Sequence, residues 1–122
     1  MKIYACDACG KLVMILKEGT PETICCGKPM HELRPGTTDG MPEKHVPVYT
    51  VNGTTVTVKV GSAEHPMLPA HHIEWIALET ENGCQCRHLK SASSPRATFE
   101  LTAGDKVTGV YAYCNLHGLW KA

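Results

Sequence analysis

Aromatic residues and long apolar runs are scarce in this chain of 122 residues. Aromatic side chains make up only 6% of it, with a single Phe and two Trp. The core must therefore be modest and rich in Val, Ile and Leu, a composition that suits β-structure. No stretch approaches the roughly 18 apolar residues of a membrane span, and residues 1–5 do not begin a signal peptide's apolar segment. We therefore expect a soluble, cytoplasmic protein.

A net charge is also lacking. The 12 Lys and Arg residues are balanced by 12 Asp and Glu residues, so the formal net charge at pH 7 is zero. A binding surface for nucleic acid or an anionic membrane is usually marked by an excess of basic residues. The sequence therefore predicts neither partner.

Cysteine and histidine are abundant, with seven of each. The number of cysteines is odd and no export signal accompanies them. In a reducing compartment, cysteines more commonly serve as thiolate metal ligands than as a disulfide framework. Both residue types are clustered along the chain, so metal binding is the first hypothesis.

A turn-rich segment, residues 35–42, predicts a boundary between a domain of residues 1–36 and a domain of residues 37–122. The first is too short to fold without a staple. The second breaks into short β-like runs without any sustained helical period. Two hairpins are predicted, one around a type I′ turn at Asn52-Gly53 and one around residues 81–83. Six or seven short strands predict an all-β, immunoglobulin-like antiparallel sandwich.

The first candidate site consists of Cys6, Cys9, Cys25 and Cys26. In Cys-x-x-Cys-Gly, two thiolates converge while Gly10 permits a positive φ. Neighbouring residues of a strand point to opposite faces, so Cys25 and Cys26 share a metal only if the chain turns sharply, and Gly27 provides a place for that turn. Four thiolates fit zinc or a single iron equally well. Either metal would supply the staple that the small domain needs.

The second candidate site consists of His45, His65, His71, Cys114 and His117. Taken singly, each histidine is more commonly an ordinary surface or hydrogen-bonded residue. Together they offer five donors, one fewer than an octahedron, whereas structural zinc sites close at four. An open position implies chemistry there. A thiolate opposite that position would push electron density through the metal, as a cysteine ligand does in certain haem enzymes.

Five motifs in order make this sequence resemble desulfoferrodoxin, the two-iron class of superoxide reductase. Cys-x-x-Cys-Gly and Cys-Cys-Gly, at residues 6–10 and 25–27, are similar to the desulforedoxin domain. The other three are similar to the neelaredoxin domain: Glu-Lys-His-Val-Pro at 43–47, His-Pro-Met-x-x-x-His-x-Ile-x-Trp at 65–75, and Cys-Asn-x-His-Gly at 114–118. The resemblance covers nearly the whole chain.

The resemblance implies two iron ions per chain. One would be held by the four cysteines, and the other by four equatorial histidines and the axial Cys114. The implied reaction adds one electron and two protons to superoxide and gives hydrogen peroxide without releasing oxygen, as oxidative-stress defence in an anaerobe or microaerophile. A rubredoxin-like electron donor and a homodimer are further expectations from the family.

Residues beside the ligands receive roles from the same resemblance. Lys44 would attract superoxide and order water for protonation, and Glu43 would occupy the sixth position after oxidation. Without the resemblance, both read as a solvated surface pair. The family spacing selects His71 rather than its neighbour His72 as the ligand.

Two other readings of the sequence remain open. One is a zinc-binding interaction module, and the other is an electron carrier or redox sensor that uses the four-cysteine iron. Cys84 and Cys86 have no assigned role and are interpreted as ordinary core or surface thiols.

Overall fold

A computed structural model describes residues 1–122, which form two compact units, Met1–Arg34 and Pro35–Ala122. All but one of the secondary-structure elements are β-strands, which confirms the predicted all-β class. The predicted boundary between residues 36 and 37 stays a prediction. The structure contains no helix with the length and apolar character that crossing a bilayer requires.

The N-terminal unit is built from five very short strands: β1 (Lys2–Ala5), β2 (Leu12–Ile15), β3 (Ile24–Cys25), β4 (Lys28–Pro29) and β5 (His31–Glu32). β1 lies between β2 and β5, and β3 pairs only with β4. The buried side chains of this unit are few, namely Ile3, Ala5, Cys6 and Met30. Such a core stabilises a fold very little, so the need for a staple follows from the structure as well.

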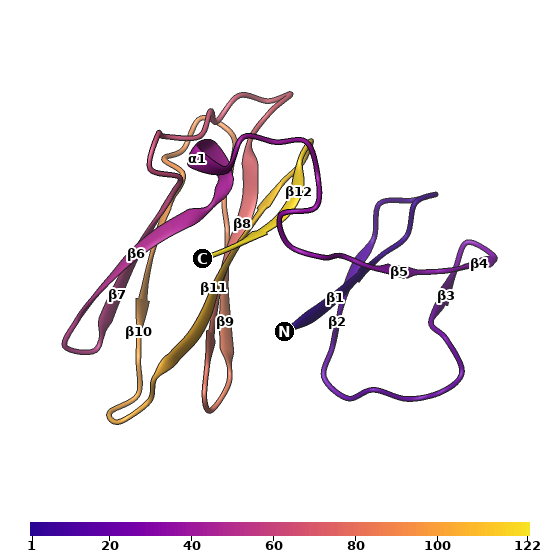
Figure 1. Ribbon diagram of the computed structural model, residues 1–122, viewed down its shortest axis with the longest axis horizontal. Coiled ribbons are helices and arrows are strands. Elements are labelled where there is room, and N and C mark those ends of the chain that lie inside the picture. Colours follow the sequence, from indigo (N-terminus) through magenta and orange to yellow (C-terminus); the bar gives the residue numbers. More distant parts are fainter. The chain divides into compact units, whose positions relative to one another are not determined.

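The C-terminal unit is a sandwich of two antiparallel sheets (Figure 1). One sheet has the order β10 (Arg96–Glu100), β7 (Thr55–Val60) and β6 (Pro47–Asn52). The other has the order β12 (Gly118–Lys121), β11 (Val107–Cys114), β8 (Ile73–Thr80) and β9 (Cys84–His88). Alternate residues of β7, Val56, Val58 and Val60, are fully buried and belong to one apolar cluster with Ile76, Leu78, Phe99 and Val110.

The predicted hairpin at Asn52-Gly53 is present, but its turn lies one residue further along. Asn52 pairs with Thr55, so the two turn residues are Gly53 and Thr54. Only Gly53 has a positive φ, of 63°. This pattern fits a type II′ turn, which needs glycine at its first central position, rather than the predicted type I′ turn. The hairpin around residues 81–83 is present as predicted.

Two elements were not predicted from the sequence: β12, which directly follows His117, and α1, which carries His45. β12 begins at Gly118 and pairs with β11 across the turn that carries His117. A single helical turn, α1 (Pro42–His45), begins at a proline and is closed by the Val46 N–H donating to the Pro42 oxygen at 2.8 Å. Proline suits a first helical position because its fixed φ is already helical and no N–H is lost from the ladder.

Candidate metal centres

The four-cysteine cluster depends on a sharp turn between β3 and β4. Cys25 pairs with Lys28, so Cys26 and Gly27 are the two central residues of the turn. Both have positive φ values, 52° and 74°. Positive φ at both positions defines a type I′ turn, and a non-glycine residue adopts it at a cost of about 1–2 kcal/mol. This strained backbone is what lets adjacent cysteines face one point.

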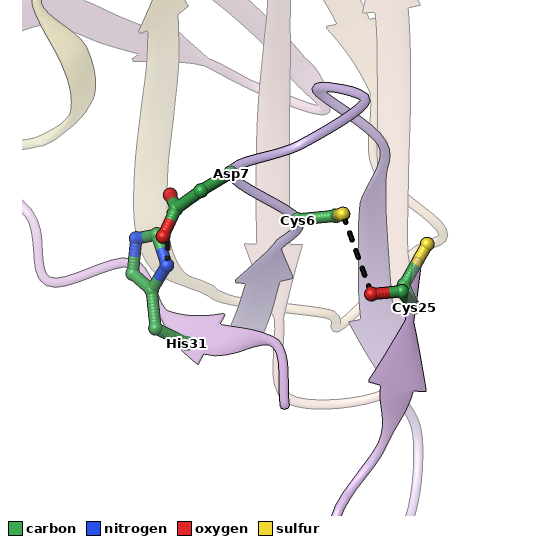
Figure 2. A network of polar contacts seen from close by, with 4 residues as sticks. All are labelled: Cys6, Asp7, Cys25 and His31. Atoms are coloured by element: carbon green, nitrogen blue, oxygen red, sulfur yellow. Dashed lines mark hydrogen bonds and ion pairs between the residues drawn. The ribbon is translucent and has the colours of Figure 1, made fainter. Parts of the chain in front are cut away.

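The sulfur atoms of this cluster lie at metal-site spacing. The Cys25 Sγ is 3.7 Å from the Cys9 Sγ and 4.0 Å from the Cys26 Sγ. Sulfurs bound tetrahedrally at about 2.3 Å from one metal lie about 3.8 Å apart. Figure 2 shows Cys6, at the end of β1, directing its side chain toward Cys25 on β3. The four thiols therefore fit a single tetrahedral metal ion.

The ionisation of the four thiols also favours binding of a cation. N–H groups of Cys9 and Ala8 help to lower the pKa of Cys6 to about 7, whereas the interaction with the Cys6 sulfur raises the pKa of Cys25 to about 12. Neighbouring thiolates repel, so they do not all ionise together in the free protein. A bound metal ion offsets this repulsion, and its binding would release protons.

The second cluster is carried by α1 and by segments at the ends of sandwich strands, and Figure 1 shows where α1 lies beside these strands. His45 ends α1, His65 and His71 lie in the connection from β7 to β8, and Cys114 ends β11. Ligand atoms of these four residues all lie within 4.8 Å of one another. His117, in the β11–β12 turn, places its Nδ1 3.1 Å from the His45 Nε2 and 3.8 Å from the Cys114 Sγ. All five predicted residues therefore meet.

Two of the rings have a fixed orientation and tautomer. The Nδ1 of His45 is 2.8 Å from the Met41 oxygen, and the Nδ1 of His65 is 2.7 Å from the Pro66 oxygen. A carbonyl oxygen only accepts, so each Nδ1 carries the proton and each Nε2 presents a lone pair. These two Nε2 atoms lie 3.1 Å apart. Adjacent nitrogens bound to one metal at about 2.1 Å lie about 3.0 Å apart, so the facing lone pairs fit a shared metal ion.

The third ring points to the same conclusion. The Nε2 of His71 is buried and has no hydrogen-bond partner. Burial lowers the pKa of all three histidines, and that of His65 falls to about 4. A neutral imidazole is the form that binds a metal ion. These three imidazoles are therefore in the neutral form that can bind a cation.

Cys114 is fully buried at the end of β11, just past a β-bulge. The bulge lies between the pairs Tyr113–Trp75 and Cys114–Ile73, so β8 carries one extra residue there. Bulges commonly re-aim side chains beside functional sites. Burial raises the pKa of Cys114, while the N–H groups of Leu116 and His117 act in the opposite direction. These N–H groups are suited to stabilise a sulfur that is ionised by a metal.

Three residues that support this cluster were not recognised as such from the sequence. Trp120 is buried, and its ring stacks on His45 with centroids 4.9 Å apart. Its Nε1 donates to the His117 oxygen at 3.0 Å. A Cβ on Gly40 would lie 3.0 Å from the His117 Cβ, and one on Gly61 would lie 2.6 Å from the Lys44 carbonyl carbon. The only sequence signal for them is their nearness to the motifs.

Glu43 and Lys44 both lie on α1, with Glu43 exposed and Lys44 partly buried. The backbone carbonyl oxygen of Glu43 accepts hydrogen bonds from the Ala63 N–H at 2.9 Å and the Ser62 hydroxyl at 3.2 Å. Burial is the largest cause that lowers the pKa of His45 and His71, and the positive charge of Lys44 is a smaller cause in the same direction. The ammonium group is therefore close enough for its field to reach the cluster.

The remaining cysteines and histidines lie outside both clusters. Cys84 and Cys86 are exposed on the edge strand β9. His72 directs its Nδ1 toward the Leu68 oxygen at 3.0 Å, whereas its neighbour His71 faces the cluster. His31 pairs with Asp7 at 3.2 Å (Figure 2).

The fold and the two clusters define a class: a two-unit, all-β metalloprotein with a four-cysteine centre and a separate histidine–cysteine centre. Family models for desulfoferrodoxin and for its N-terminal domain match residues 37–122 and 1–33. The chain belongs to the desulfoferrodoxin family.

Relatives match along nearly the whole length. Desulfoferrodoxin of Nitratidesulfovibrio vulgaris is 47% identical, covering 99% of this chain and 94% of the relative. The superoxide reductase structure from Treponema pallidum is 39% identical with a TM-score of 0.81, covering 98% of both chains. A structure of superoxide reductase (1Fe-SOR) from Giardia intestinalis is 33% identical with a TM-score of 0.57, covering 66% of this chain and 95% of that one.

Proposed function

We propose that this protein is a superoxide reductase that works at the histidine–cysteine centre. One superoxide, one electron and two protons give one hydrogen peroxide, and no oxygen is released. The observation that carries the proposal is the set of neutral imidazoles whose lone pairs face one point beside the Cys114 sulfur. The family and the named superoxide reductase relatives support the choice of this reaction.

Two iron ions per chain are the cofactors. Cys6, Cys9, Cys25 and Cys26 would hold one, and His45, His65, His71, His117 and Cys114 would hold the other. Five protein donors leave one position for a small molecule. An iron(II) ion held by these five residues would supply the electron that reduces superoxide.

The surrounding residues attract the substrate and orient the groups that would hold the metal. Lys44 attracts the superoxide anion and stabilises the negative charge that grows on the reacting oxygen atoms. The carbonyls of Met41 and Pro66 fix two imidazole rings, and the N–H groups of Leu116 and His117 stabilise the ionised Cys114 sulfur.

We assign Glu43 to the sixth position after oxidation. An unaltered oxidised spectrum in Glu43→Ala would count against that role.

The family also supports three further proposals. We propose a rubredoxin-like protein as the electron donor, a homodimer as the assembly, and the cytoplasm as the location. Reduction of the oxidised protein by a reduced rubredoxin, sedimentation of the purified protein and cell fractionation test these in turn.

Metal analysis with visible spectra of the reduced and oxidised protein tests the function and separates it from the rivals. We expect iron at two per chain, a red or pink protein, and a deepening toward grey or blue on full oxidation. A zinc-binding module would be colourless. An electron carrier would contain iron but would fail to consume superoxide in the presence of an external electron donor.

A further inference from the structure

His71, which is partly buried, is held in the cluster differently from the two buried histidines. His45 and His65 each have a ring nitrogen bonded to a backbone carbonyl, which fixes the ring. The His71 ring has no such bond, and its buried Nε2 has no partner. Metal-binding histidines usually donate their second ring nitrogen to a partner that orients them. Something other than the ring must therefore orient His71.

The Asn115 side chain binds the backbone on both sides of His71. Its Oδ1 accepts the His72 N–H at 2.9 Å, and its Nδ2 donates to the Ala70 oxygen at 3.0 Å. The main-chain N–H of Asn115 also donates to the His72 oxygen at 3.2 Å. An N–H partner on one side and a carbonyl partner on the other leave one orientation for the amide.

Asn115 directly follows Cys114 in the chain. Its hydrogen bonds therefore join the segment that carries Cys114 to the residues on either side of His71. Because the flanking backbone is held on both sides, the starting direction of the His71 side chain is set relative to Cys114. This is the orienting constraint that the His71 ring itself lacks.

We propose that Asn115 is a positioning residue that fixes His71 for metal binding in place of a hydrogen bond to its ring. The inference rests on the proposed metal site but not on the superoxide reaction. It predicts that loss of the Asn115 amide loosens the metal at this centre alone.

The test measures how fast iron leaves each centre when a chelator is added. The four-cysteine centre is an internal control, because both centres of one molecule are exposed to the same chelator. In Asn115→Ala we expect iron to leave the histidine–cysteine centre about 10–100-fold faster, as is typical when an outer-shell partner of a ligand is lost. The thiolate absorption of the oxidised centre should shift, while iron release from the four-cysteine centre stays unchanged. Asn115→Asp keeps an acceptor for the His72 N–H and loses the donor to Ala70, so its release rate should be intermediate.

Asn82→Ala is the matched control variant. Asn82 also joins two loops, through a 3.1 Å hydrogen bond to Asp105, but these loops lie outside the cluster. Wild-type iron release and absorption in Asn115→Ala, or the same change in Asn82→Ala, would overturn the proposal. If Asn115→Ala does not fold, Asn115→Asp decides, and an unchanged release rate there overturns it. A wild-type protein that binds iron without reducing superoxide would refute the function and leave this inference standing.

Discussion

Lys44 and Glu43 precede the ligand His45 with opposite charges on one helical turn. Lys44 is partly buried. Burial is the main cause that lowers the pKa of His45 and His71, and the positive charge of Lys44 is a smaller cause in the same direction. The same field would attract an anion that approaches the cluster, which is the role proposed for Lys44. At this scale the electrostatic role of one side chain can be separated from metal binding.

Lys44→Ala should slow the second-order reaction with superoxide by about tenfold or more, the loss of about 1.4 kcal/mol of stabilisation. The iron spectrum should stay largely unchanged, because no ligand is lost. Pulse radiolysis measures the rate, and Lys106→Ala, in a turn outside the cluster, is the control. An unchanged rate in Lys44→Ala would remove the steering role.

Cys114→Ser should abolish the thiolate charge-transfer band of the oxidised centre, because the hydroxyl that replaces the buried thiol gives no such transition. Visible absorption of the oxidised protein is the measurement. Cys86→Ser replaces an exposed thiol outside both clusters and should leave the band intact. Survival of the band in Cys114→Ser would mean that another group supplies the sulfur.

At the scale of elements, α1 is held close to the start of the β7–β8 connection. A Cβ on Gly61 would collide with the backbone of Glu43 and lie 2.6 Å from the Lys44 carbonyl carbon. The backbone there cannot move without moving the helical turn that carries Lys44 and His45. The close approach therefore requires glycine at this position.

Gly61→Ala should lower the free energy of unfolding by about 1–3 kcal/mol, the usual cost of overpacking. It should also slow superoxide reduction, because α1 is displaced. Thermal unfolding and the superoxide rate are the readouts. Gly83→Ala is the control, since a Cβ there meets no atom within 4 Å and its φ is not positive. Equal behaviour of the two variants would contradict the account of the close approach.

Elements with a repeated local pattern were predictable from the sequence, and those set by a single contact were not. The hairpin of β8 and β9 follows from β-rich runs around a glycine-containing turn. β12 was missed because its four residues are too few to show a pattern. The bulge at the start of β8, opposite the end of β11, arises from pairing between strands, which composition does not encode.

The candidate ligands could be predicted from the sequence, but the residues that support them could not. Cysteine and histidine types in clusters indicate metal binding, and the resemblance selected His71 over His72. The supporting contacts of Trp120, Gly40 and Asn115 arise only when distant segments meet. These residues are common elsewhere in proteins as packing or turn residues, so their type alone does not reveal the role.

At the scale of the whole molecule, each unit contains a complete set of candidate ligands. The four cysteines lie within Met1–Arg34, and the histidine–cysteine cluster lies within Pro35–Ala122. Neither centre borrows a ligand from the other unit. Removing one metal should therefore leave the other in place.

Cys9→Ser should remove the absorption of the four-cysteine iron and destabilise the N-terminal unit, which has few buried side chains. The superoxide rate of the other centre should stay within about twofold of wild type, as expected for sites without shared partners. Iron content and pulse radiolysis on the same sample provide the comparison. A tenfold slower reaction would show that the two centres are coupled.

The central claim is that superoxide is reduced and not dismutated, and product stoichiometry tests it most directly. Superoxide is supplied at a known dose to the fully reduced protein, and peroxide and oxygen are measured together. The account predicts one hydrogen peroxide per superoxide consumed, no released oxygen, and one oxidised histidine–cysteine centre per event. Release of one oxygen for every two superoxide ions, with the centre still reduced, would contradict it.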